Sequence, residues 1–331
     1  MKVVIPMAGY GTRMRPHTYS RPKPLLTVAG HPMLKHLLDT LDGIDVDEYI
    51  FIVGYLGDQI EQWVREHYAF NATFVVQEEL IGQAHAIHLA REHLEGPAII
   101  LFSDTLFEGD LSVINETDSD GIVFVKEVDD PRRFGVVEIN ASGRVTGFVE
   151  KPDSVENKNA LIGLYYIRDS KAMIRSIETQ MQRNEMTKGE FYIADAFQIM
   201  VNEGANFRIQ EVDVWLDTGK PDAVLETNRW LLAHGRDNTG QVPEGDYRVV
   251  PPVFIHPEAH IQNAVIGPYA SIGAGCKVEY SVVANSIIDE HGVVRHMVLD
   301  GSLIGQQASV LGRPHCLNIG DSSSVELSID D

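Results

Sequence analysis

The chain has 331 residues, and its 48 Asp and Glu residues against 27 Lys and Arg residues give it a formal net charge of −21 at pH 7. This composition, with 44% hydrophobic and 23% charged residues, is typical of a globular protein long enough for two domains. The acidic balance argues against binding to nucleic acid or to an anionic membrane surface, and the absence of long apolar runs and of an evident secretory signal predicts a cytoplasmic protein.

The N-terminal stretch combines a predicted strand, a glycine loop and a cluster of cations. Residues 2–7 are apolar enough for a buried strand. A loop follows that contains Ala8, Gly9, Gly11 and Thr12. Glycines in such a loop let backbone N–H groups approach phosphates. No acid precedes Asp39, whereas the same segment carries Lys2, Arg13, Arg15, Arg21, Lys23 and Lys35. This local charge favours a polyphosphate ligand.

The spacing beyond the glycine loop is the specific signal. The loop lacks the third glycine of a dinucleotide-binding fingerprint, which argues against a dehydrogenase, and the chain contains no P-loop pattern. Instead Gly11 is followed by Thr-Arg-Met-x-Pro, and Lys23, flanked by two prolines, comes ten positions after Arg13. This stretch resembles the signature of the sugar-1-phosphate nucleotidyltransferases. The resemblance implies transfer of a nucleotidyl group from an NTP to a sugar 1-phosphate, with Arg13 and Lys23 as catalytic residues and the glycine loop on the nucleotide.

Predicted strands and helices alternate over the next part of the chain. Continuous apolar runs predict strands at 49–53, 73–77 and 98–102. Apolar residues at helical spacing predict helices at 57–67 and 82–94. This order predicts an α/β fold with a doubly wound, mostly parallel sheet, in which ligands bind beyond the carboxyl ends of the strands.

Gln77 and Asp104 lie at two of these strand ends. A side-chain amide matches the N3–H and adjacent carbonyl of uracil or thymine, and the resemblance implies that Gln77 and Gly82 contact the base. Gln83 departs from related pyrimidine-specific enzymes, which often have Leu or Thr there, so thymine and uracil both stay open. An Asp after a strand is as readily a cap as a metal ligand, and the resemblance implies that Asp104 binds a Mg²⁺ shared with the nucleotide phosphates.

From residue 121 the pattern changes to antiparallel strands. They are predicted at 121–128, 134–139 and 144–149, the last two joined by a turn. The resemblance implies that this half binds the sugar 1-phosphate through Gly135, Glu150, Lys151 and Gly163. A carboxylate can accept hydrogen bonds from sugar hydroxyls, and a lysine can bind the phosphate. An exposed Glu-Lys pair after a strand is the alternative.

A second acidic motif closes the predicted catalytic domain at residues 1–236. Trp-Leu-Asp-Thr-Gly at 215–219 follows a predicted helix at 190–203 and a strand at 206–212. The resemblance implies that Asp217 binds the same Mg²⁺ as Asp104, although Asp217 could instead cap the helix predicted at 221–232. Residues 237–250, with Gly, Pro and Asn and few apolar residues, are the predicted linker.

Hexapeptide repeats characterise the last part, residues 251–331. The copies begin with Ile-Gly at Ile266, Ile304 and Ile319, and other aliphatic residues follow the same period of about six. Such a period predicts a β-helix whose aliphatic residues stack inward, and the resemblance implies the left-handed form found in longer family members. We expect a packing and oligomerisation role, hence a homo-oligomer. Acyl transfer is the alternative, with a base chosen from His256, His260, His291, His296 and His315.

The resemblance is specific for the reaction and less so for the substrates. It favours dTTP with glucose 1-phosphate, followed by UTP with glucose 1-phosphate and then GTP with mannose 1-phosphate. A non-catalytic regulatory relative would be expected to lose catalytic or metal residues, yet Arg13, Lys23, Asp104 and Asp217 are all present.

Overall fold

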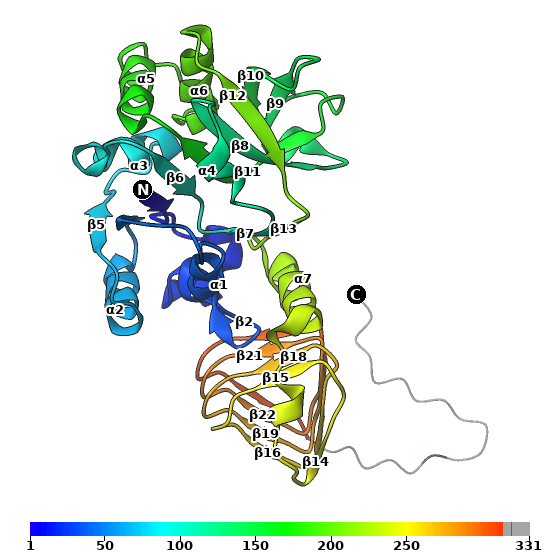
Figure 1. The fold of residues 1–331 in the computed structure, drawn as a ribbon. Coiled ribbons are helices and arrows are strands. Elements are labelled where there is room, and N and C mark those ends of the chain that lie inside the picture. The colour runs from blue at the N-terminus through cyan, green and yellow to red at the C-terminus, as the bar shows by residue number, and fades with distance from the viewer. Residues whose placement is uncertain (314–318, 320–331) are drawn as a thin grey trace. The chain divides into compact units, whose positions relative to one another are not determined.

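The computed structural model describes residues 1–313 and 319, in two compact units that divide between Trp230 and Leu231 (Figure 1). The division falls a few residues before the predicted domain end at 236. The exact bounds of the catalytic domain, the linker and the C-terminal domain stay predictions, as does the homo-oligomer. In the part of the chain that is described, no helix is long and apolar enough to span a membrane.

The first unit is built on a nine-stranded mixed sheet. Its parallel part consists of β6 (Ala98–Leu101), β1 (Lys2–Pro6), β4 (Glu48–Val53) and β5 (Ala72–Val76), in that spatial order. The remaining strands are β8 (Gly121–Glu127), β9 (Gly135–Ile139), β10 (Val145–Glu150), β11 (Asn159–Ile167) and β12 (Phe207–Glu211). Strand β11 joins the two parts, because it pairs antiparallel with β6, β8 and β9. The predicted doubly wound α/β sheet is confirmed.

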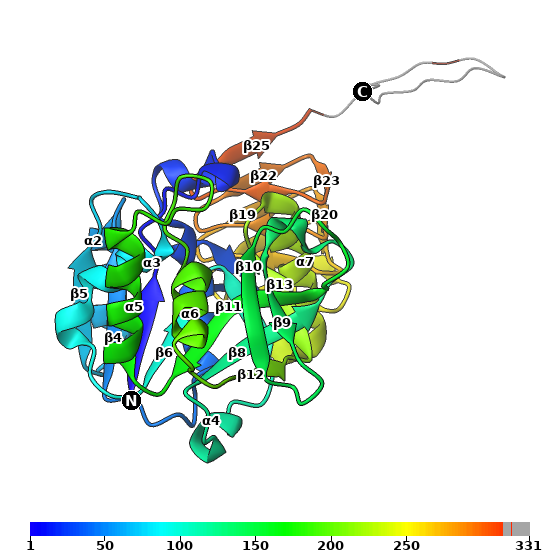
Figure 2. The same ribbon diagram turned by 90° about the horizontal axis from the view of Figure 1, so that it is seen from above.

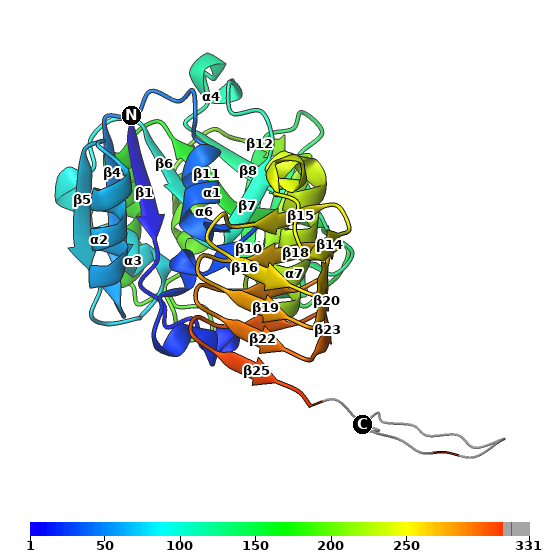
Figure 3. The ribbon, with the colours of Figure 1, turned by 90° about the horizontal axis from the view of Figure 1, so that it is seen from below.

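Helices cover both faces of this sheet. One face carries α3 (Gln83–Leu89), α5 (Ser170–Gln182) and α6 (Ile193–Asn202), as Figure 2 shows. The other carries α1 (Met33–Asp39) and α2 (Gly57–His67), as Figure 3 shows. The unit also contains α4 (Val113–Glu116) and all but the last residue of α7 (Pro221–Leu231). Because the sheet is covered twice, its central strands are largely apolar, and all four residues of β6 are buried.

Two small sheets stand apart from the large one. The first pairs β2 (Thr27–Val28) with β3 (His31–Pro32), and the second pairs β7 (Thr105–Glu108) with β13 (Val214–Asp217). The β7–β13 pair matters for function, because it brings two acidic motifs together that are more than a hundred residues apart in the sequence.

Two helices differ from their predicted bounds. Helix α3 ends at Leu89, and a separate 3₁₀ turn at Arg91–His93 completes the stretch predicted as one helix. Helix α6 begins at Ile193, three residues after the predicted start. The reason is tertiary: the Phe191 N–H donates to the Ile81 carbonyl at 2.9 Å, and the Phe191 carbonyl accepts from the Ala84 N–H at 2.9 Å. The backbone N–H and carbonyl of Phe191 are therefore bonded to the segment of Ile81 and Ala84, and Phe191 does not join helix α6.

The second unit contains three parallel sheets of four strands each. The first consists of β14 (Tyr247–Val249), β17 (Ala264–Ile266), β20 (Val282–Ala284) and β23 (Val298–Asp300). The second consists of β15 (Val253–Ile255), β18 (Ala270–Ile272), β21 (Ile287–Ile288) and β24 (Leu303–Ile304). The third consists of β16 (His260–Gln262), β19 (Lys277–Glu279), β22 (Val293–Arg295) and β25 (Ser309–Leu311).

The chain visits these sheets in turn, so each coil of the unit contributes one strand to each sheet. The predicted left-handed β-helix is confirmed. Its interior is a column of aliphatic residues at the hexapeptide spacing, including Ile266, Ile272 and Val278, all fully buried. Strand β14 lies within the predicted linker and pairs with β17. Of the repeat at Ile319, all residues after the isoleucine lie outside the described part of the chain, as does His315.

Candidate active site

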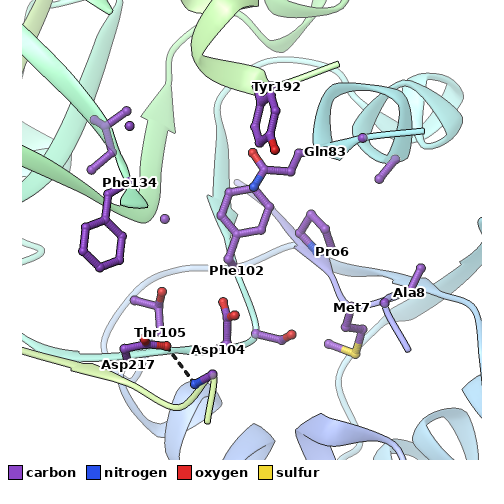
Figure 4. Close-up of a pocket in the computed structure, with 18 of the residues that line it drawn as sticks. Pro6, Met7, Ala8, Gln83, Phe102, Asp104, Thr105, Phe134, Tyr192 and Asp217 are labelled. Carbon is purple, nitrogen blue, oxygen red and sulfur yellow. Dashed lines mark hydrogen bonds between the residues drawn. The ribbon is translucent and has the colours of Figure 1, made fainter. Parts of the chain in front are cut away.

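A cavity of about 660 Å³ in the first unit is lined by every residue that was predicted for the site, and Figure 4 shows Ala8, Asp104 and Asp217 among them. The predicted residues are Ala8, Gly9, Gly11, Thr12, Arg13, Lys23, Gln77, Gly82, Asp104, Gly135, Glu150, Lys151, Gly163 and Asp217. The cavity opens where β1, β5 and β6 end, which is the expected position of a ligand site in a parallel sheet. Residues assigned to the nucleotide, the metal and the sugar phosphate thus share one site.

A tight turn at Gly11 connects the glycine loop to the segment that carries the two predicted catalytic cations, Arg13 and Lys23. Gly11 adopts the left-handed conformation, with φ 61°, and a Cβ there would lie 3.0 Å from Thr18 Cγ2. The Thr18 hydroxyl donates to the Gly11 carbonyl at 2.8 Å. Three short 3₁₀ turns follow, and Lys23 begins the last of them. A larger residue at Gly11 would open this turn.

Lys23 and Asp104 form an ion pair in the cavity. The Lys23 Nζ lies 3.0 Å from Asp104 Oδ2, and the lysine side chain is only 12% exposed. Burial alone would raise the pKa of Asp104, but the charge and hydrogen bond of Lys23, with a further contribution from Arg13, hold it below its usual value. Asp104 is therefore ionised at neutral pH.

The second acid, Asp217, lies beside the first because of strand pairing. In the β7–β13 ladder Asp217 is opposite Thr105, and the next residue, Thr218, donates its N–H to the Asp104 carbonyl at 3.2 Å. The Asp217 Oδ1 accepts from the Gly219 N–H at 2.7 Å, the bond drawn in Figure 4. A Cβ on Gly219 would lie 3.1 Å from Arg13 Nη2, so the guanidinium packs against this glycine.

This acid pair suits a metal that is shared with a substrate. Mg²⁺ commonly takes one or two carboxylates and leaves its other positions to phosphate and water. Among the described residues no group of three or more His, Cys, Asp or Glu could enclose a metal ion by itself. Asp104 and Asp217 fit a site of one or two carboxylates that phosphate and water complete, since both carboxylates line the cavity together with Arg13 and Lys23.

The predicted base-binding residues are joined to each other. Gln77 is 6% exposed, and its Nε2 donates to the Gly82 carbonyl at 3.3 Å and lies 3.3 Å from His85 Nδ1. Gly82 has φ 127°, and a Cβ there would lie 2.4 Å from both the N and the O of Phe191. Only glycine fits so close an approach of two backbones. The base end of the cavity is therefore tied to the segment before α6.

At the predicted sugar end, where Glu150 and Lys151 lie, the carboxyl group has a raised pKa, whereas the pKa of Asp104 is lowered. Glu150 ends β10 opposite Gly135 of β9, and a Cβ on that glycine would lie 2.7 Å from Glu150 Oε2. Burial, opposed by Lys151 and reinforced by Asp195 and Glu190, raises the pKa of Glu150 to about 7. This carboxyl group thus changes its charge near neutral pH.

Lys151 is held by its backbone and by its ammonium. It has φ 49°, its N–H donates to the Phe134 carbonyl at 3.0 Å, and its Nζ donates to the hydroxyl of Tyr192. Tyr192 and Glu190 line the cavity but were not predicted as site residues. Their only signal in the sequence was that two polar side chains stand at the start of a stretch predicted to be helical.

Comparison with known proteins gives the class of this enzyme. A family model described as "Nucleotidyl transferase" matches residues 2–234. The chain belongs to this family, and the predicted nucleotidyltransferase is confirmed.

The chain is similar over its whole length to two curated proteins. It is 28% identical to a glucose-1-phosphate thymidylyltransferase of Streptomyces antibioticus, over 99% of each chain. It is also 28% identical to a low-salt glycan biosynthesis nucleotidyltransferase, Agl11, of Haloferax volcanii, over 99% of this chain and 100% of that protein. A bifunctional protein GlmU of Methanococcus maripaludis is 29% identical over 70% of this chain and 54% of its own length.

Proposed function

We propose that this nucleotidyltransferase joins a nucleoside triphosphate to a sugar 1-phosphate and releases pyrophosphate, with dTTP and glucose 1-phosphate as its substrates. The observation that carries the proposal is the shared cavity, whose lining combines cations and acids suited to a triphosphate with Glu150 and Lys151. The name of the full-length Streptomyces relative supports glucose 1-phosphate and a thymidylyl group.

The proposed reaction is an in-line displacement at the α-phosphorus of the NTP. An oxygen of the sugar phosphate forms the new P–O bond, and the bond to the β-phosphate breaks as pyrophosphate leaves with its electron pair. A phosphate monoester has a second pKa of about 6, so the nucleophile is largely ionised near neutral pH and needs no dedicated base. Positioning and charge stabilisation then account for the catalysis.

Each end of the cavity has its own part in this reaction. Arg13 and Lys23 bind the triphosphate and stabilise the charge that develops on the leaving pyrophosphate. Asp104 and Asp217 would hold Mg²⁺, which neutralises charge on the α-phosphate when it is bound. Glu150 accepts hydrogen bonds from sugar hydroxyls, and Lys151 binds the phosphate of the sugar.

The amide of Gln77 matches both thymine and uracil, which differ only by a methyl group. UTP is therefore the second candidate, and GTP with mannose 1-phosphate the third.

The test is pyrophosphate release with Mg²⁺ and glucose 1-phosphate, comparing dTTP, UTP and GTP at equal subsaturating concentrations. We expect the highest kcat/KM with dTTP. A higher value with UTP would reassign the base but keep the reaction. No release with any of the three, with either glucose 1-phosphate or mannose 1-phosphate, would contradict the proposed function.

A further inference from the structure

The side chain of Tyr192 is held in place by the residues packed around it. Its side chain lines the cavity at the sugar end, and the whole residue is only 5% exposed. Its carbonyl accepts a hydrogen bond of 3.1 Å from the Nε2 of Gln180, a residue with no exposed surface. Tyr192 also precedes α6, whose first turn follows directly. The phenol is therefore held by the packing around it rather than by any substrate.

Lys151, in contrast, has a long side chain that needs a partner to be held in one place. Its Nζ donates to the Tyr192 hydroxyl. An ammonium has donors only, so the phenol oxygen must be the acceptor in this bond. Fixing a lysine side chain costs rotamer entropy. A lysine that is already held in the free enzyme has met this cost before the substrate arrives.

The phenol of Tyr192 is neutral when it accepts this bond. Burial first, and then the charge of Glu190 and hydrogen bonding to it, raise the pKa of Tyr192. The partner of the Lys151 ammonium in this bond is therefore an uncharged hydroxyl. Lys23 differs, because Asp104 pairs with it directly at 3.0 Å.

We propose that Tyr192 is a positioning residue that directs the ammonium of Lys151 at the phosphate of the sugar 1-phosphate. This inference rests on the proposed function. It assigns to Tyr192 a role in binding one substrate through another residue: the neutral hydroxyl orients the lysine and leaves its positive charge to the incoming phosphate. The effect is confined to the sugar phosphate, because Lys151 is not placed on the NTP.

The experiment is steady-state kinetics of the full-length Tyr192→Phe variant. This change removes the hydroxyl and keeps the ring that packs before α6. We expect the KM for glucose 1-phosphate to rise about threefold to tenfold, the range of one hydrogen bond, with kcat and the KM for the NTP unchanged within about twofold. Tyr166→Phe is the matched control, since Tyr166 is 7% exposed and is not among the residues that line the cavity.

A double-mutant cycle separates positioning from a direct contact between Tyr192 and the sugar. If Tyr192 acts through Lys151, the Tyr192→Phe change adds no further rise in KM to a Lys151→Met variant. The same rise in both backgrounds would overturn the inference, as would an unchanged KM in the single variant. If the wild-type enzyme turned over normally in either of these cases, the inference about Tyr192 would fail and the proposed function would stand. A wild-type enzyme without turnover on any sugar 1-phosphate would overturn both.

Discussion

The residues proposed for the triphosphate and metal (Arg13, Lys23, Asp104 and Asp217, the phosphate end) and those proposed for the sugar phosphate (Glu150, Lys151 and Tyr192, the sugar end) balance their charges differently. At the phosphate end each acid has a cation beside it: Lys23 pairs with Asp104, and Arg13 packs against the glycine that binds Asp217. The pKa of Asp104 is lowered as a result. At the sugar end, burial and neighbouring acids raise the pKa of Glu150 to about 7. The carboxylate of Asp104 thus keeps its charge across the neutral range, whereas the carboxyl group of Glu150 does not.

This difference separates what each end can contribute. The cations Arg13 and Lys23 at the phosphate end suit a reaction in which negative charge develops on a leaving group. A carboxyl that titrates near neutrality suits recognition, because its strength as an acceptor depends on pH. Changes at the phosphate end should therefore act on kcat, and changes at the sugar end on the KM of one substrate.

The largest effect is expected from Lys23→Met, which removes the ammonium and keeps most of the side-chain volume. We expect kcat to fall by about 10² to 10³, the usual cost of one lost charge-stabilising donor, with little change in the KM for the sugar phosphate. The measurement is initial-rate kinetics with both substrates varied. Lys35→Met is the matched control, because Lys35 lies in the same basic segment but pairs with Asp39 at 2.8 Å. An unchanged kcat for Lys23→Met would remove this lysine from the mechanism.

Gly82→Ala should disturb both ends at once, because the new Cβ would lie 2.4 Å from backbone atoms of Phe191. We expect a loss of about 2 kcal/mol or more in the free energy of unfolding, measured by urea denaturation, and higher KM values for both substrates. Gly43→Ala is the control: Gly43 has φ 91° but no atom within 4 Å of a new Cβ, so it isolates the backbone strain. Equal losses in the two variants would show that the contact with Phe191 is unimportant.

Glu150→Gln should show the pH dependence of the sugar end. Because the pKa of Glu150 is about 7, the wild type gains an acceptor carboxylate as the pH rises from 6 to 8. The KM for glucose 1-phosphate should be about tenfold higher in the variant at pH 8, the scale of a lost hydrogen bond to a charged group. The two proteins should converge at pH 6. Ionisation of the substrate affects both proteins equally, so a constant ratio of KM values would argue against titration of Glu150.

The smallest effect concerns the stability of the folded protein, which Glu150→Gln should raise although it weakens substrate binding. An acid whose folded pKa of about 7 exceeds its ordinary value of 4.5 costs folding energy once it ionises. The cost is absent below pH 4.5, grows between 4.5 and 7, and is complete above 7. Glu150→Gln should therefore melt a few degrees above the wild type at pH 8 and at the same temperature near pH 4.5. A lower melting temperature for the variant at pH 8 would contradict the direction of the shift.

The roles assigned to the residues of the phosphate end stay predictions, and Asp217 comes close to Asp104 only through the β7–β13 pairing, which no local pattern shows. Arg13 and Lys23, however, belong to one short stretch, and Asp104 comes two residues after a predicted strand, so these three could be named as candidates without knowing the fold. The β-helix was predictable for a similar reason: every coil buries the same position of the repeat, and residues such as Ile266 and Ile272 mark it. In both cases the pattern and the structure depend on neighbours in the chain.

At the sugar end, Gly135, Glu150, Lys151 and Gly163 were named from the resemblance, whereas Tyr192 depends on contacts that no local pattern carries. Tyr192 lines the cavity because Phe191 pairs with the loop at Gly82, about a hundred residues earlier. Strand β11, the link between the parallel and antiparallel parts of the sheet, was not predicted either. Its apolar run does not alternate, and Gly163 in its middle has φ 86° beside a shift in the pairing register with β8. Such a run is compatible with either a strand or a helix.

The most direct test of the central claim follows the α-phosphorus of the nucleotide. The protein would be incubated with Mg²⁺, glucose 1-phosphate and dTTP labelled at the α-phosphorus, and the products separated. The account predicts that the label appears in a nucleotide sugar in equal amount to the pyrophosphate released, and that both products depend on Lys23. Label found only in free nucleoside monophosphate, or equal yields from the Lys23→Met variant, would contradict it.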